Sequence, residues 1–151
     1  MHLVPIIETG ALAEYPAELA ATISAVLQAT TQMYCRKGYE PPWIGYLAIE
    51  NGACVGTCGF NGPQRSNEVE IAYFTFPGNE GMGVATRMAS ALLAIAQKAR
   101  PDPPSVLAHT LPEENASTSI LRKLGFSLEG EVIHPEDGNI WQWRFNENVE
   151  A

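Results

Sequence analysis

A glycine loop that connects a strand-like run to an amphipathic helix constrains the fold of this chain more than any other feature. The loop, Glu80 to Thr86, has glycines at positions 81 and 83 and follows a β-branched and aromatic run at residues 68–76. Beyond it, apolar residues recur at the spacing of one helix face, at Met88, Ala89, Leu92, Leu93 and Ala96. A helix placed after a strand in this way returns the chain to a parallel neighbouring strand. The loop therefore predicts an α/β fold whose sheet contains a parallel pair.

The same loop has the properties of an anion-binding site. The first N–H groups of a helix have no partner within the helix, the helix dipole adds partial positive charge there, and glycines let an anion approach the backbone. A dinucleotide-binding loop would also need a third small residue, an early place in a parallel unit and an acidic residue about 20 residues further on. The nearby acid, Asp102, instead lies in a proline-rich turn at residues 101–104. A phosphorylated ligand and a turn without a ligand both remain open at this point.

The rest of the chain alternates between strand and helix patterns. In chain order we expect an edge strand at residues 3–7, a helix at 16–33, strands at 43–49, 53–60 and 68–76, the helix after the loop, a strand at 105–110, a helix between Asn115 and Gly125, and strands at 127–133 and 139–145. Pro5 restricts the first strand to an edge, and Asn51-Gly52 marks a hairpin. This order predicts a mixed sheet with one parallel pair.

Length, composition and charge exclude several classes of protein. A chain of 151 residues forms one domain, residues 1–151, that is large enough to bury a core without metals or disulfides. No apolar run reaches the roughly 20 residues that cross a bilayer and no signal peptide precedes the fold, so we expect a cytoplasmic protein with no membrane partner. The net charge of −8 argues against nucleic acid and is compatible with a cationic amine. Cys35, Cys54 and Cys58 match no zinc or redox spacing, and no metal site is expected.

Two motifs in the expected order resemble those of the GNAT (general N-acetyltransferase) superfamily. The family loop reads Gln or Arg, two residues, Gly, one residue, then Gly or Ala, and these places hold Glu80, Gly83 and Ala85. Residues 112–117 (PEENAS) and 121–130 (LRKLGFSLEG) look like the second signature of the branch that acetylates N-terminal amino groups of ribosomal proteins. The resemblance covers residues 43–145. It implies an α/β, GNAT-like fold with a mixed, mostly antiparallel sheet, one parallel splayed strand pair and helices on both faces.

The resemblance also implies acetyl-CoA as the cofactor. Its pyrophosphate would bind the backbone of the loop, at Gly81, Met82, Gly83, Val84, Ala85 and Thr86. In the family the pantetheine arm pairs with the exposed edge of the strand before the loop, which here is Phe74, Thr75 and Phe76. One N–H group of that edge would contact the thioester carbonyl and stabilise the oxyanion. Asn115 either binds the pantetheine or caps the following helix.

The chain departs from the family pattern at two positions that matter for chemistry. Glu80 replaces Gln or Arg and puts a carboxylate beside the diphosphate, so we expect its side chain to point into solvent. Leu121 occupies the position of the Tyr that protonates the leaving thiolate in many members, and Leu cannot donate a proton. Ser117 matches a Ser that the ribosomal-protein branch has early in the same helix, and a capping or surface role for Ser117 remains open.

An acceptor amine must lose a proton before it can attack, which requires a general base. Glu70 is our first choice, because alternation along its strand puts Glu70, Ala72 and Phe74 on one face and acids recur at this place in similar acetyltransferases. His109 is the second, because it ends the strand that is expected to diverge from the cofactor edge. A solvated Glu on a half-exposed strand and a His bonded to backbone at a strand end are the structural alternatives.

The leading hypothesis is an acetyl-CoA-dependent N-acetyltransferase that acetylates a primary amine directly, either a peptide N-terminus or a small-molecule amine. A catalytically weak acyl-CoA-binding or regulatory module is the second hypothesis, supported by Leu121 and Glu80. A nucleotide-binding oxidoreductase is the third. Tyr73, Trp43 and Tyr46 are candidates for lining the acceptor pocket, although aromatic residues of strands more often belong to the core. The sequence leaves the acceptor, a homodimer and the preferred acyl chain open, and it assigns no role to His2 or His134.

Overall fold

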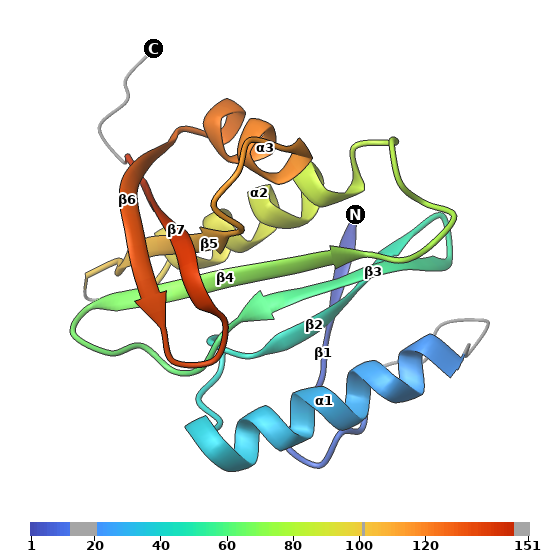
Figure 1. Ribbon diagram of the computed structural model, residues 1–151. Coiled ribbons are helices and arrows are strands. Elements are labelled where there is room, and N and C mark those ends of the chain that lie inside the picture. Colours follow the sequence, from blue (N-terminus) through green and yellow to red (C-terminus); the bar gives the residue numbers. More distant parts are fainter. Residues whose placement is uncertain (13–20, 101, 147–151) are drawn as a thin grey trace.

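Seven strands form a single sheet in the computed structural model, which describes residues 1–12, 21–100 and 102–146 (Figure 1). The strands are β1 (His2–Pro5), β2 (Gly45–Glu50), β3 (Ala53–Phe60), β4 (Glu68–Thr75), β5 (Ser105–Thr110), β6 (Phe126–His134) and β7 (Gly138–Phe145), and their order in the sheet is β1-β2-β3-β4-β5-β7-β6. Every neighbouring pair is antiparallel except β4 and β5, which form the parallel pair that the glycine loop predicted. β1 lies at one edge, the position that Pro5 requires.

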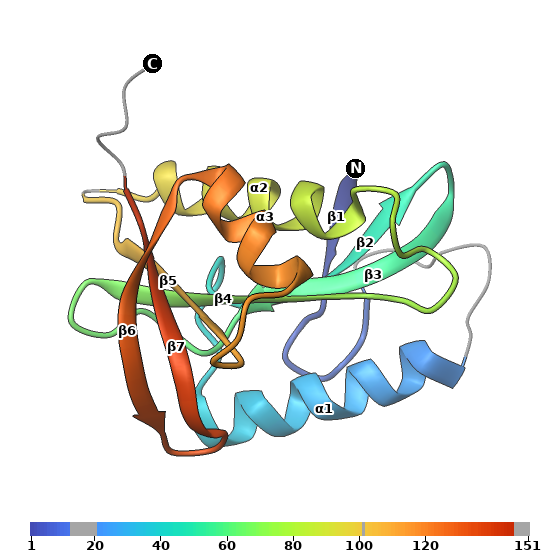
Figure 2. The ribbon, with the colours of Figure 1, turned by 45° about the horizontal axis from the view of Figure 1, so that its top comes forward.

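Helices cover both faces of the sheet, as expected. The helices are α1 (Ala21–Lys37), α2 (Val84–Gln97) and α3 (Ala116–Leu124). Helix α1 lies on one face, and α2 and α3 lie together on the other (Figures 1 and 2). Met88 and Leu92 of α2 are fully buried, because the apolar stripe of this helix packs on β3 and β4. None of the helices in the described part of the chain is long and apolar enough to span a membrane.

The parallel strands separate halfway along β4. Their pairing extends from Glu68 opposite Ser105 to Ile71 opposite Ala108, whereas β4 itself continues to Thr75. Beyond Ile71 the backbone of β4 therefore has no strand on its β5 side. This confirms the splayed pair, and it leaves an opening in the sheet directly before the glycine loop.

Helix α1 ends later than the apolar pattern indicated. The expected start at Pro16 lies outside the described residues, and the helix ends at Lys37 instead of Met33. Gly38, with φ of +106°, stops it there and donates its N–H to the carbonyl of Tyr34 at 2.9 Å. The additional turn brings Lys37 within 2.9 Å of Asn61, which follows β3.

Candidate active site

Three adjoining pockets follow the opening between β4 and β5. The loop pocket lies between the glycine loop and α3, the central pocket lies where the strands separate, and the α1-side pocket lies beneath α1; their volumes are about 440, 420 and 210 Å³. The loop and central pockets share Tyr73 and Ser117, and the central and α1-side pockets share Asn61 and Tyr73. The pockets therefore adjoin one another along the opening, with Tyr73 on the boundary of all three.

The glycine loop presents bare backbone to the loop pocket. Gly81 and Gly83 have φ of +76° and +77°, a left-handed conformation that side chains disfavour, and Gly83 is the N-cap of α2. No side chain caps this helix end, so the first-turn N–H groups stay available. Among the predicted cofactor residues, Phe74, Thr75, Gly81, Gly83, Val84, Ala85 and Thr86 line the loop pocket, whereas Phe76 is buried in the core and Met82 is exposed without lining it.

Glu80 lines the loop pocket, and its carboxylate is hydrogen-bonded to the turn in front of the loop. The side chain is exposed, as expected, and its Oε1 accepts a hydrogen bond of 2.7 Å from the N–H of Gly78. Because Gly78 has φ of +93°, this bond closes a tight turn in front of the loop. The carboxylate at this unusual position therefore holds the loop in shape.

The backbone of β4 offers N–H groups to the opening. Phe76 donates its N–H to the carbonyl of Val55 in β3 at 2.9 Å. Because hydrogen-bonding direction alternates along a strand, the N–H groups of Tyr73 and Thr75 point away from β3, toward the side where β5 has separated. The N–H of Phe74 faces β3, like that of Phe76. Among the three predicted edge residues, Thr75 therefore has the N–H that faces the opening.

Asn115 and Thr118 cap α3 and leave Ser117 out of the cap. The Oδ1 of Asn115 accepts from the N–H of Thr118 at 3.1 Å, and the hydroxyl of Thr118 accepts from the N–H of Asn115 at 2.9 Å. The capping role considered for Asn115 is therefore observed. Asn115 and Ser117 both line the central pocket, and Ser117 also lines the loop pocket.

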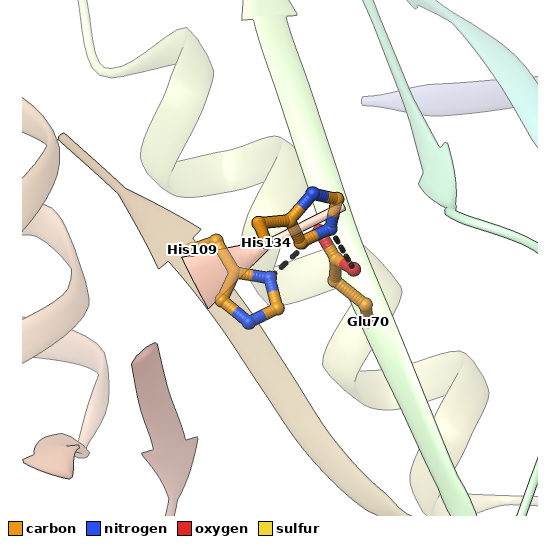
Figure 3. Close-up of side chains that lie close together, drawn as sticks. All are labelled: Glu70, His109 and His134. Atoms are coloured by element: carbon orange, nitrogen blue, oxygen red, sulfur yellow. Dashed lines mark ion pairs between the residues drawn. The ribbon is translucent and has the colours of Figure 1, made fainter. Parts of the chain in front are cut away.

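Glu70, His109 and His134 lie together (Figure 3), and Glu70 and His109 line the central pocket. Glu70 pairs with Leu107 across β4 and β5, which puts His109, two residues after Leu107, on the same face. Oε2 of Glu70 is 2.9 Å from Nδ1 of His109, and Oε1 is 3.8 Å from Nε2 of His134. The two bases that the sequence proposed as alternatives are therefore one pair, and His134 is a third member that sequence reasoning missed.

The hydrogen bonds of Gln142 fix the proton of His109. Gln142 donates its amide nitrogen to Glu129 at 2.8 Å, so its oxygen is the atom that lies 3.0 Å from Nε2 of His109. Nε2 must then carry a proton, and in the neutral ring Nδ1 has a lone pair on the side of Glu70. Nδ1 is buried and makes no directed hydrogen bond with any described residue, although the 2.9 Å contact with Glu70 is a close ion pair. Proton transfer at this site therefore concerns Nδ1.

Charge interactions overcome the effect of burial on both members of the pair. Burial alone would raise the pKa of Glu70, but His109, Asn61 and the charge of His134 lower this pKa below its usual value. Burial alone would lower the pKa of His109, but Glu70 and Gln142 raise it above its usual value. The pair therefore favours a carboxylate beside an imidazolium.

By spacing, the three side chains also resemble a metal site. Their donor atoms lie within 4.8 Å of one another, and two His with one carboxylate is a zinc-binding set. Nδ1 of His134 accepts the N–H of Glu136 at 3.2 Å and also lies 3.5 Å from Oδ2 of Asp137, and the backbone hydrogen bond puts the proton of the neutral ring on Nε2, the atom nearer to Glu70. A metal ion would have to displace this proton. In this structure, the hydrogen bonds of the three side chains form a proton-transfer arrangement.

Two of the aromatic residues expected in the acceptor pocket belong to the core instead. Trp43 is buried and packs edge-on against Phe60 at a centroid distance of 5.0 Å. Tyr46 is buried and donates its hydroxyl to the carbonyl of Pro42 at 2.8 Å. Only Tyr73 of the three lines the pockets. No local pattern distinguishes these strand aromatics, because core and pocket positions share the same residue types.

Comparisons with known proteins give a consistent family and fold. The family model described as an acetyltransferase (GNAT) domain matches residues 9–127. The comparison with curated proteins finds no significant match. A spermidine N-acetyltransferase mutant from Vibrio cholerae has 10% identity and a TM-score of 0.67, with 96% of this chain and 94% of that chain covered. A streptothricin acetyltransferase from Bacillus anthracis, solved with acetyl coenzyme A, has 18% identity and a TM-score of 0.59, with coverage of 75% and 67%. A ribosomal L7/L12 alpha-N-protein acetyltransferase in complex with coenzyme A has 19% identity and a TM-score of 0.62, with coverage of 82% and 70%.

Proposed function

Because the chain belongs to the GNAT acetyltransferase family, we propose that it transfers an acetyl group from acetyl-CoA directly to a primary amine. The observation that carries this proposal is the row of adjoining pockets that leads from the glycine loop, along the opening in the sheet, to the Glu70–His109 pair. Anion binding, an open strand edge and a proton acceptor occur along it in the order that acetyl transfer from a phosphorylated thioester requires.

The residues along this row of pockets fit acetyl-CoA. The loop backbone at Gly81 to Thr86 would bind the pyrophosphate, because its N–H groups are uncapped and glycine side chains do not obstruct them. The pantetheine would lie along β4 at Phe74 and Thr75, with the free amide nitrogen of Asn115 nearby on the wall of the central pocket. Acetyl-CoA would supply the acetyl group, and coenzyme A would leave as the free thiol.

The pair at the central pocket would activate the amine. Glu70, whose carboxylate lines the central pocket, would take a proton from the substrate ammonium and pass it to Nδ1 of neutral His109, and the carboxylate would then stabilise the imidazolium that results. The amine nitrogen can then form its bond to the acetyl carbon as the carbon–sulfur bond breaks. The N–H of Tyr73 or Thr75 would donate to the developing oxyanion. Ser117 would protonate the departing thiolate, and the proton that the nitrogen loses on becoming an amide would restore the Ser117 hydroxyl.

The α1-side pocket supports an acceptor with an uncharged, apolar body. Met33, Phe60 and Phe74 line it, and none of the lining residues in the described part of the chain is charged. A polyamine would place its second cation there without a carboxylate partner, which is unfavourable. We therefore propose a primary amine carried on an apolar group, either a small molecule or a peptide with an apolar first residue.

The proposal is tested by calorimetry with acetyl-CoA together with thiol release from a panel of amines. We expect acetyl-CoA to bind, and 2-phenylethylamine and a peptide with N-terminal Leu to be acetylated faster than spermidine. Binding without turnover on any amine would favour the second candidate, an acyl-CoA-binding module, which the fully buried Leu121 at the usual Tyr position supports. Binding of NAD but not of CoA would contradict both.

The activity should depend on pH through the Glu70–His109 pair. His109 is in contact with Glu70 of β4 and with Gln142 of β7, which is itself bonded to Glu129. The β6–β7 hairpin adds His134, whose ring packs against His109, and the negative charge of Asp137. Because the pKa of His109 is raised, the pair stays protonated up to a higher pH than a free imidazole would. While it is protonated it cannot accept a proton from the substrate. We expect kcat/KM to rise with pH through an apparent pKa above about 6.5 that belongs to the pair. A flat profile between pH 5 and 8 would contradict this.

Ser117→Ala should slow turnover without destabilising α3. Because Asn115 and Thr118 form the cap, the helix keeps its N-terminal hydrogen bonds when the Ser117 hydroxyl is removed. Loss of a proton donor to the thiol should lower kcat about tenfold or more. Thermal unfolding and acetyl-CoA binding should match the wild type, and an unchanged kcat would leave Ser117 with no part in the reaction.

A further inference from the structure

We infer that a closed ring of contacts positions Glu70, and that His134 and Lys37 are its positioning residues. We call it the Glu70 ring; its members are Glu70, Asn61, Lys37, Glu136 and His134. It joins β4 to the end of α1 and to the β6–β7 hairpin, which converge at this corner of the molecule (Figure 2). The inference rests on the proposed function only where activity is the readout.

One half of the ring runs from α1 to the carboxylate. Nζ of Lys37 donates to Oδ1 of Asn61 at 2.9 Å and forms an ion pair with Oε1 of Glu136 at 3.1 Å. The bond from Lys37 fixes the amide of Asn61 so that its nitrogen donates to Oε1 of Glu70 at 3.3 Å. A residue at the end of α1 therefore controls a donor to the carboxylate without contacting it.

The other half runs through the hairpin. Glu136, held by Lys37, donates its backbone N–H to Nδ1 of His134 at 3.2 Å, which leaves the Nε2 proton on the side of Oε1 of Glu70, 3.8 Å away. The side chains of His134 and Glu70 are only 12% and 22% exposed, so this electrostatic contact is weakly screened. Both halves of the ring thus bring N–H groups to the same carboxylate oxygen.

The Glu70 ring offsets a repulsion that arises within the Glu70–His109 pair. When His109 is neutral, its Nδ1 lone pair and Oε2 of Glu70 face each other at 2.9 Å, and two acceptors repel at that distance. Asn61, which donates to Oε1, and the nearby N–H of His134 hold the carboxylate in place against this repulsion. The carboxylate therefore stays at the central pocket, where a substrate ammonium can donate to it, with Nδ1 of His109 directly behind it as the final acceptor.

The ring predicts that His134 stabilises the Glu70 carboxylate electrostatically and is not the proton acceptor. His134→Ala removes this favourable contact, which makes the carboxylate more basic, so the pair should hold its proton more tightly. We expect the NMR titration midpoint of the His109 ring to move to higher pH and kcat to fall about tenfold. His134→Gln, which retains an N–H donor, should restore both toward the wild type. If Gln is as defective as Ala in a folded protein, or if Ala leaves the midpoint unchanged, the positioning role is wrong.

Lys37→Met tests the ring from outside the site, and Arg36→Met is its matched control. Arg36 also approaches Glu136, at 3.8 Å, and Arg36→Met removes the same positive charge as Lys37→Met. Only Lys37, however, forms a hydrogen bond with Asn61. Lys37→Met should shift the His109 midpoint in the same direction as His134→Ala, and Arg36→Met should not. Equal shifts of the His109 midpoint in the two variants would show that the effect comes from net charge alone, and the positioning role of the Glu70 ring would then be wrong. Because the NMR titration needs no substrate, it decides the ring even if the wild type acetylates none of the amines.

Discussion

Glu70→Gln is expected to lower kcat about a hundredfold or more while leaving acetyl-CoA affinity unchanged. The substitution keeps the shape of the side chain but removes the negative charge that stabilises protonated His109. A positioned general base typically contributes between about 10² and 10⁴ in rate. The cofactor contacts lie along the loop and the β4 edge, so the dissociation constant for acetyl-CoA, measured by calorimetry, should not change.

Glu68→Gln is the matched control for this change. Glu68 lies two residues earlier on β4, on the same face, and pairs with Arg144 at 2.9 Å, away from the imidazoles. Glu68→Gln removes the same negative charge as Glu70→Gln. The kcat of this variant should stay within about twofold of the wild type, because exposed ion pairs contribute little. If Glu70→Gln also keeps the wild-type kcat from pH 6 to 9, Glu70 has no role in activating the amine.

Gly83→Val should reduce acetyl-CoA affinity on the order of a hundredfold. Gly83 has φ of +77°, and a β-branched residue in this region costs more than the roughly 1–2 kcal/mol of an ordinary side chain. The loop can relieve this strain only by changing its backbone, which moves the N–H groups that would bind the pyrophosphate; each charge-assisted bond contributes about 1.5–3 kcal/mol. A Cβ here would meet Nη1 of Arg87 at 2.7 Å, the end of a flexible side chain, so folding itself should be retained.

Gly52→Val separates strain from binding. Gly52 has nearly the same backbone conformation, with φ of +78°, and an added Cβ would meet nothing within 4 Å. It lies in the β2–β3 turn and not in the loop pocket. Both variants should lose thermal stability by similar amounts, and only Gly83→Val should lose acetyl-CoA binding in calorimetry. Wild-type affinity in a folded Gly83→Val protein would show that the pyrophosphate binds elsewhere.

The fold could be predicted from the sequence because its signals are local. The stripe from Met88 to Ala96, the left-handed glycines of the loop and the Asn115 to Gly125 helix each depend on residues within a few turns. The parallel pair followed from the crossover through α2. The end of α1 was wrong by one turn, because its last residues are held by tertiary contacts of Tyr34 and Lys37 and not by an apolar stripe.

By itself the sequence determined the α/β fold and the place of the glycine loop in it, and it pointed to two separate candidates for the base, Glu70 and His109. The tertiary structure decided that these two form one pair and that His134, which had no local signature, joins them. The reason is that β7 inserts between β5 and β6, which brings Gln142 to His109 and turns the β6–β7 hairpin toward the end of α1. Proton positions and pKa directions depend on partners from four different segments, and no periodicity within a single segment contains that information.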